Sequence, residues 1–60
     1  MKIYIKYTKC PEKIIDNVLQ IHYYTGVYNE KFIRIEYEKD GKLFTKTDNM
    51  IAIKTIDIFN

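Results

Sequence analysis

The chain has 60 residues, enough for one small domain spanning residues 1–60 and too few for a large buried core. Its net charge of +2 is too small to indicate a dedicated nucleic-acid binder, and its single cysteine excludes a disulfide framework. No stretch approaches the roughly 18 consecutive apolar residues of a membrane-spanning helix, so we expect no membrane association. The sequence therefore predicts a cytoplasmic protein of the producing or host cell.

The first predicted element is a strand over residues 2–8. Ile3, Ile5 and Tyr7 alternate with Lys2 and Lys6, which places the apolar side chains on one face and the charged ones on the other. This period of two is typical of a half-buried strand. The strand is expected to end before Pro11, because proline lacks a backbone donor.

Residues 11–24 fit two interpretations. Apolar side chains recur there at helical spacing, Pro11 suits a first helical turn, and Gly26 suits a stop. The same stretch ends in residues 18–24, which alternate and are rich in β-branched and aromatic side chains. We favour a strand over residues 18–24 paired with residues 32–38, and the helix remains the alternative.

The second half of the chain predicts a hairpin. Residues 32–38 alternate between apolar and charged side chains, and Asp40-Gly41 separates them from a return strand over residues 43–47. Asp-Gly between two alternating runs is the strongest short-range hairpin signal.

A turn at Asp48-Asn49 is expected to lead into a last strand over residues 50–59. The apolar positions change parity within that strand, which predicts a bulge or short turn near Lys54 and Thr55.

Together these elements predict an all-β fold: an antiparallel meander of about five strands, curled into a small open barrel or a strongly bent sheet. The alternative is an α+β fold, with one helix at about residues 11–24 packed on a four-stranded antiparallel sheet.

Isoleucine, lysine, tyrosine and asparagine make up half of the chain, and their AT-rich codons indicate a low-GC genome. The order of the segments Asn17-Val18, 32–41, 48–51 and 56–58 resembles small all-β accessory proteins of low-GC bacteria and their prophages. The resemblance covers about the last 45 residues. It implies an all-β fold and a mobile-element setting, and it transfers no functional residues.

No motif predicts catalysis. His22 is the only histidine, and its conceivable metal-binding partners Cys10, Glu12 and Asp16 lack a spacing typical of zinc ligands. A nucleophilic Cys10 would need His22 as its base, and there is no glycine-rich phosphate loop. The sequence predicts no enzyme, no metal and no cofactor.

The six tyrosines exceed what one small core can hold. If Tyr7, Tyr23 and Tyr37 point inward, another three remain outside, and exposed tyrosines mark partner surfaces. Three lysines of the basic N-terminal segment could join them. The candidate surface is thus Tyr4, Tyr24, Tyr28, Lys2, Lys6 and Lys9.

Two functions follow as hypotheses. The first is a non-enzymatic protein-binding module, such as a phage or mobile-element inhibitor of a host factor, with anti-CRISPR proteins as the nearest analogy in size and origin. The alternative is a small β-sheet protein that binds single-stranded nucleic acid, with tyrosines stacking bases and lysines neutralising phosphates. In either case the short chain and the surplus tyrosines predict a homo-oligomer, most simply a dimer.

Overall fold

The protein is described by a computed structural model that covers all 60 residues. Strands hold 68% of the chain, and no α-helix is present. The elements, in chain order, are β1 (Lys2–Tyr7), β2 (Lys13–Ile15), β3 (Val18–Thr25), β4 (Lys31–Lys39), β5 (Lys42–Asn49), the short 3₁₀ helix η1 (Met50–Ala52) and β6 (Ile53–Phe59).

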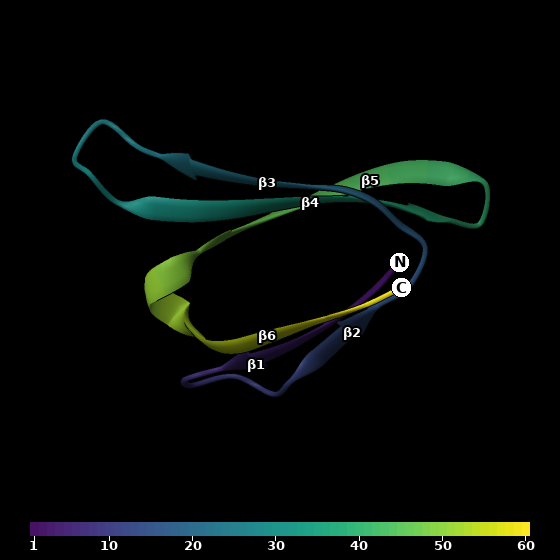
Figure 1. Cartoon of the computed structure of the whole chain (residues 1–60), viewed down its shortest axis with the longest axis horizontal. Coiled ribbons are helices and arrows are strands. Elements are labelled where there is room, and N and C mark those ends of the chain that lie inside the picture. The colour runs from purple at the N-terminus through teal and green to yellow at the C-terminus, as the bar shows by residue number, and fades with distance from the viewer.

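The strands form two antiparallel sheets that lie in two layers (Figure 1). The first sheet has the order β2-β1-β6, and the second has the order β3-β4-β5. The all-β prediction is confirmed. The helix over residues 11–24 is wrong, because that segment holds β2 and β3. The pairing of residues 18–24 with residues 32–38 is also confirmed, since Ile21 lies opposite Ile35.

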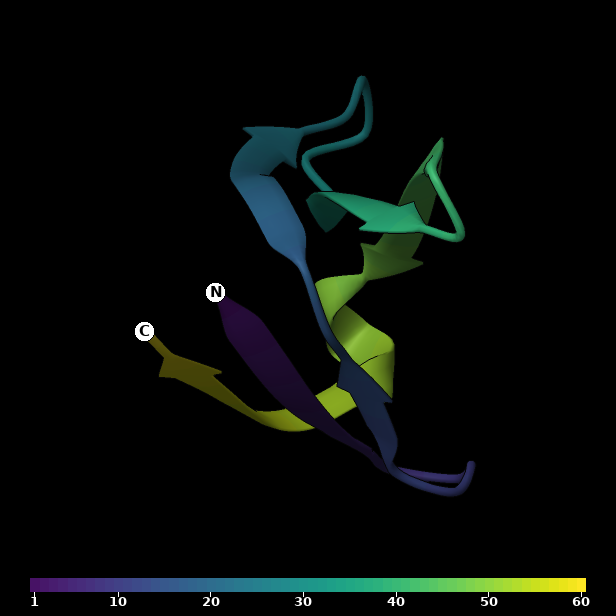
Figure 2. The ribbon, with the colours of Figure 1, turned by 90° about the vertical axis from the view of Figure 1, so that its right-hand side faces the viewer.

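The chain passes between the layers at two places (Figures 1 and 2). Only Asp16 and Asn17 separate β2 from β3, and Asn17 adopts a positive φ of 54° that turns the chain from one sheet into the other. At the other crossing η1 connects β5 to β6. The two sheets do not close into a barrel.

The core lies between the layers. Six side chains are buried, and four of them are completely inaccessible: Ile3 and Ile5 from β1, and Ile33 and Ile35 from β4. Both central strands therefore direct alternate isoleucines inward, as their period of two predicts. Burying each such side chain stabilises the fold by about 1.5–3 kcal/mol.

A polar link joins the sheets beside this core. The hydroxyl of Tyr7 on β1 donates a hydrogen bond of 2.7 Å to Asp48 Oδ2 on β5. The other carboxylate oxygen of Asp48 accepts a bond of 3.4 Å from Lys46 Nζ, which also lies 5.8 Å from the centre of the Tyr7 ring. The three side chains thus form one cluster, in which Tyr7 and Asp48 are 41 positions apart in the sequence.

The hairpin at Asp40-Gly41 is confirmed. Lys39 pairs with Lys42 across these two residues, and both Asp40 and Gly41 have positive φ values, 54° and 75°. A two-residue turn with positive φ at both positions matches the twist of the flanking strands.

The predicted turn at Asp48-Asn49 is wrong, because both residues lie in β5 and pair with β4. The chain turns one position later, at η1, where the Asn49 side chain accepts a hydrogen bond from the Ile51 amide and caps the helix. The last strand consequently begins at Ile53. The predicted irregularity near Lys54 is confirmed, since the register of β1 and β6 skips Lys54.

Candidate functional site

The structure divides the predicted site residues between separate surfaces. Lys2, Tyr4 and Lys6 lie on the outer face of β1 in the first sheet, and we call this set the β1 face. Tyr24 lies on the outer face of the second sheet, and Tyr28 lies in the β3–β4 loop. Because the two outer faces point away from each other, Tyr4 does not share a surface with Tyr24. The exposed Lys9 lies in the loop after β1.

The β1 face is only partly basic. Lys6 Nζ lies 5.8 Å from the centre of the Tyr4 ring, a distance suited to a cation–π contact. Lys2 Nζ, however, is 3.5 Å from Asp16 Oδ1.

Acidic groups also surround Tyr4. A hydrogen bond to Glu12 is the main cause that raises the pKa of Tyr4, followed by burial and by the charges of Glu12 and Asp57. Asp57 lies directly opposite Tyr4 in the β1–β6 register. The tyrosine that sequence reasoning placed among lysines therefore stands beside carboxylates as well.

The other surface is the end of the β3–β4 hairpin. We call it the aromatic hairpin and define it as Tyr23, Tyr24, Val27, Tyr28 and Phe32. Val27 and Tyr28 at its tip are 93% and 90% exposed. The rings of Tyr24 and Phe32 stack with their centroids 5.2 Å apart and an interplanar angle of 23°. The hairpin end thus carries exposed apolar side chains at its tip and on both faces of its strands.

Tyr23 was expected to point inward, and its position only partly meets this expectation. It lies opposite the buried Ile33, on the face of β3 that is directed at the first sheet. The β3–β4 hairpin extends beyond the first sheet in Figure 1, so Tyr23 remains 60% exposed. Sequence alternation gives the face of a side chain, and the length of the opposing sheet decides whether that face is covered.

Local hydrogen bonds hold the hairpin in one shape. The Gly26 amide donates to the Glu30 carbonyl at 2.8 Å, and the Asn29 amide donates to the Gly26 carbonyl at 3.1 Å. Lys31 Nζ donates to the Thr25 hydroxyl at 3.1 Å. A hollow of about 420 Å³ opens beside this end of the hairpin, lined by Tyr23, Tyr24, Thr25, Lys31, Phe32 and Met50.

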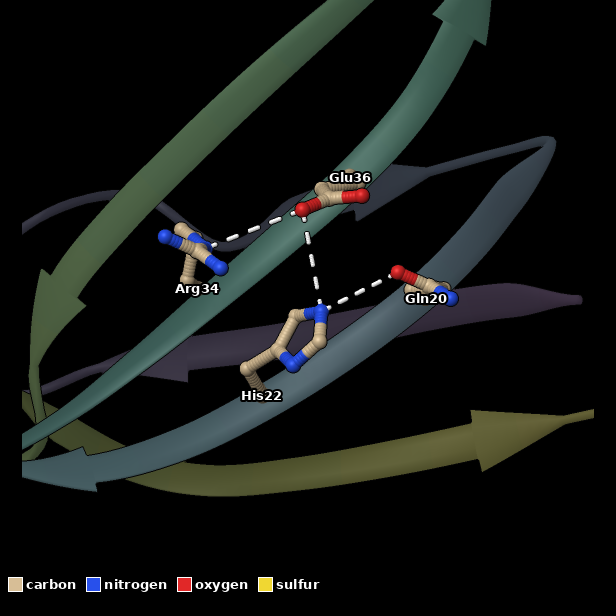
Figure 3. A network of polar contacts seen from close by, with 4 residues as sticks. All are labelled: Gln20, His22, Arg34 and Glu36. Atoms are coloured by element: carbon tan, nitrogen blue, oxygen red, sulfur yellow. Dashed lines mark hydrogen bonds and ion pairs between the residues drawn. The ribbon is translucent and has the colours of Figure 1, made fainter.

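A polar network covers the middle of the same outer face (Figure 3). His22 Nε2 lies 3.1 Å from Gln20 Oε1 and 3.6 Å from Glu36 Oε1, and the latter oxygen is 3.7 Å from Arg34 Nε. Gln20 and His22 come from β3, whereas Arg34 and Glu36 come from β4. Sequence reasoning missed this network, because it arises from strand register, in which His22 faces Arg34.

The exposed Cys10 lies in the loop between β1 and β2, away from the outer face that carries His22. The structure therefore does not pair this thiol with the imidazole. No group of three or more histidine, cysteine, aspartate or glutamate side chains is arranged to hold a metal ion.

No protein-family model matches the chain, and no curated protein or solved structure is significantly similar to it. None of its helices has the length and apolar character needed to cross a bilayer.

Proposed function

We propose that the protein is a non-enzymatic binding module that recognises another protein through the aromatic hairpin. The observation that carries this proposal is the concentration of exposed apolar side chains at one end of the molecule, with Val27 and Tyr28 at the tip and the Tyr24–Phe32 stack behind them. Apolar side chains that gather on one part of a protein surface, rather than lying singly, are typical of interaction sites. Tyrosine also provides a large contact area with few rotatable bonds.

The charge of the hairpin favours a protein partner. The loop and its flanks contribute one acidic side chain, Glu30, and one basic side chain, Lys31, and the ammonium of Lys31 already donates to Thr25. A surface without excess positive charge gains little from phosphate groups, whereas a neutral aromatic surface suits the apolar centre of a protein–protein interface. The loop hydrogen bonds reduce the entropy that binding would cost.

We further propose a phage or mobile-element setting, with the protein acting as an inhibitor of a host factor in the manner of an anti-CRISPR protein. The support for this setting is the low-GC composition and the small size of the chain.

We also propose that β2 and β3 are two halves of one bent strand, because only two residues separate them. Counted in this way the chain would have the five strands expected from the sequence, although β5 and β6 belong to different sheets and do not pair as in a continuous meander.

The second candidate function is binding of single-stranded nucleic acid at the β1 face. The observation that favours it is the position of Lys6 over the Tyr4 ring, since a base could stack on the tyrosine while lysines neutralise phosphates. Asp16 beside Lys2, and Asp57 opposite Tyr4, would repel a phosphate backbone. We therefore rank this candidate below protein binding.

Affinity capture from a lysate of a low-GC bacterium tests the first proposal, with and without nuclease treatment. The baits are the unaltered chain, the double variant Val27→Ser/Tyr28→Ser and the control Leu43→Ser. Leu43 is also an exposed apolar residue beside a hairpin turn of the second sheet, at the opposite end. We expect nuclease-resistant capture that the double variant loses and the control keeps. Capture that disappears with nuclease, or that the double variant retains, would contradict the proposal.

A further inference from the structure

Strand β3 is an unusually unprotected sheet edge. Four strands, β2, β3, β5 and β6, lie at sheet edges, and β2 has only three residues. β5 and β6 both carry lysine and aspartate side chains, which discourage edge-to-edge pairing. β3 carries no lysine, arginine, aspartate or glutamate over its eight residues. A bulge interrupts its register at the start, between Val18 and Gln20, and the strand is regular from there to Thr25.

The direction of the free backbone groups follows from the hydrogen bonds at both ends of the β3–β4 pair. Gly26 donates to the carbonyl of Glu30, and Glu38 donates to the carbonyl of Asn17. Hydrogen-bonded positions alternate along an antiparallel ladder, so the even-numbered residues of β4 face β3. The partners of β4 on this strand are therefore Gln20, His22 and Tyr24. The amide and carbonyl groups of Ile21 and Tyr23 consequently point away from β4, toward the open edge.

We propose that β3 of a second copy of this chain pairs antiparallel with this edge, with the two-fold axis at His22, to form one continuous six-stranded sheet. The register sets Ile21 opposite the partner's Tyr23 on both sides of the axis, and their outward backbone groups make the hydrogen bonds. Pairs of an aromatic and a β-branched side chain stabilise such ladders. Gln20 then lies opposite the partner's Tyr24 on the outer face.

A second copy suits this edge better than an unrelated segment for two reasons. β3 contains no lysine, arginine, aspartate or glutamate, so two-fold pairing brings no two of these charged side chains together. β3 is also already extended in each copy, so pairing avoids the loss of conformational entropy that a disordered peptide would undergo on binding. Pairing would cover part of Tyr23 and Leu19, which are 60% and 52% exposed in the single chain.

This inference goes beyond the proposed function and does not depend on it. Pairing would use Tyr23 and Tyr24 of the aromatic hairpin, whereas Val27 and Tyr28 lie in the loop after β3, outside the paired residues 20–24, and remain available to another partner. A monomer that still captures a protein through the loop would overturn only the self-association. A dimer that captures nothing would overturn only the proposed function.

Sedimentation or light scattering of the purified full chain at micromolar concentrations provides the first test. We expect a species of twice the 7.3 kDa chain mass. Tyr23→Lys should give a monomer, because it places an ammonium group opposite the partner's Ile21 and sets two such groups diagonally across the axis. Leu43→Lys, on the other edge strand of the same sheet, should stay dimeric. A monomeric unaltered chain, or a dimer that Tyr23→Lys leaves intact while circular dichroism shows a folded protein, would overturn the proposal.

Cysteine cross-linking tests the register without relying on the Tyr23 variant. His22 and the partner's His22 would form a non-hydrogen-bonded pair with Cα atoms about 4.5 Å apart, within the range of a disulfide. Under mild oxidation, Cys10→Ser/His22→Cys should form covalent dimers. Cys10→Ser/Thr45→Cys, on the β5 edge, should stay monomeric under denaturing conditions. Cross-linking at position 45 but not at position 22 would place the contact elsewhere and refute the β3 pairing.

Discussion

Among single residues, Tyr7 and Asp48 make the one hydrogen bond between side chains that connects the two sheets. It connects β1 of the first sheet to β5 of the second. Alternation along β1 predicts that Tyr7 points inward, but nothing in the sequence indicates the partner of its hydroxyl. Asp48 resembles a turn residue in sequence, and only the β4–β5 register, in which it faces Ile33, directs its carboxylate toward the gap between the layers.

Replacing Tyr7 by phenylalanine removes this hydrogen bond and leaves the Asp48 carboxylate without its phenol donor. We expect the free energy of unfolding to fall by about 1.5 kcal/mol, at the lower end of the range for bonds to charged groups because the site is only partly buried. Urea denaturation measures this loss. Tyr28→Phe is the control, since Tyr28 is almost fully exposed and should change stability very little.

The same contact predicts how stability depends on alkaline pH. Burial, together with the hydrogen bond to Asp48 and the charge of its carboxylate, raises the pKa of Tyr7 above the ordinary tyrosine value of about 10. The folded state therefore favours the neutral phenol. Its stabilising contribution is complete below about pH 10 and is lost as the pH rises from there through the raised pKa.

Denaturation midpoints measured across that alkaline range should fall more steeply for the unaltered chain than for Tyr7→Phe. Tyr28→Phe should follow the unaltered chain. Equal slopes for the unaltered chain and Tyr7→Phe would show that Tyr7 ionises as readily in the folded state as in the unfolded state.

At the scale of elements, the hairpin of β4 and β5 depends on backbone conformation at the turn. Gly41 has a φ of 75°, and a Cβ atom built there would meet no neighbouring atom, so the cost of a substitution comes from the backbone alone. We expect Gly41→Ala to lower the free energy of unfolding by about 1–2 kcal/mol, because side chains rarely adopt this conformation. Gly41→Asn should cost less, since asparagine tolerates it. Equal urea midpoints for Gly41→Ala and the unaltered chain would contradict this explanation.

Local patterns predicted most strands of the fold, because a period of two and an Asp-Gly turn depend only on neighbouring residues. The segment 11–24 was ambiguous for a physical reason. Two strands meet at Asn17, whose positive φ shifts the alternation, and the shift gives Ile14, Ile15 and Val18 an apparent helical spacing. The division into two sheets could not be predicted locally, because it rests on distant pairs such as Ile3 with Ile58.

The candidate surface was predictable only in part. High tyrosine content and alternation identified Tyr24 and Tyr28 as external, and both are exposed in the structure. The stack with Phe32 and the exposure of Tyr23 depend on register and on how far the second sheet extends, which local patterns do not encode. Conversely, the pKa of Tyr4 is raised mainly by Glu12, a loop residue whose position no strand pattern indicates.

At the scale of the whole molecule, the apolar content exceeds what the core uses. Apolar residues make up 47% of the chain, yet only six of its 60 residues are buried. Two three-stranded layers enclose little volume, so many apolar side chains stay on the surface. Such a small core leaves the single chain marginally stable, and association with another copy or another protein would add to its stability.

Dimerisation through β3 therefore predicts a thermal unfolding midpoint that depends on protein concentration, because pairing stabilises the folded state by mass action. Between about 1 and 100 μM the midpoint of the unaltered chain should rise, and that of Tyr23→Lys should stay constant. A midpoint that is independent of concentration in the unaltered chain would contradict the dimer.

Binding of a protein by the aromatic hairpin is tested by measuring the affinity of the purified captured partner for four versions of the chain: unaltered, Val27→Ser/Tyr28→Ser, Leu43→Ser and Lys2→Glu/Lys6→Glu. If the hairpin holds the interface centre, the double serine variant should bind at least about 30-fold more weakly, equivalent to about 2 kcal/mol. The leucine and lysine variants should bind within about twofold of the unaltered chain. An affinity that the serine variant retains, and that the glutamate variant loses, would contradict the claim and locate binding at the β1 face.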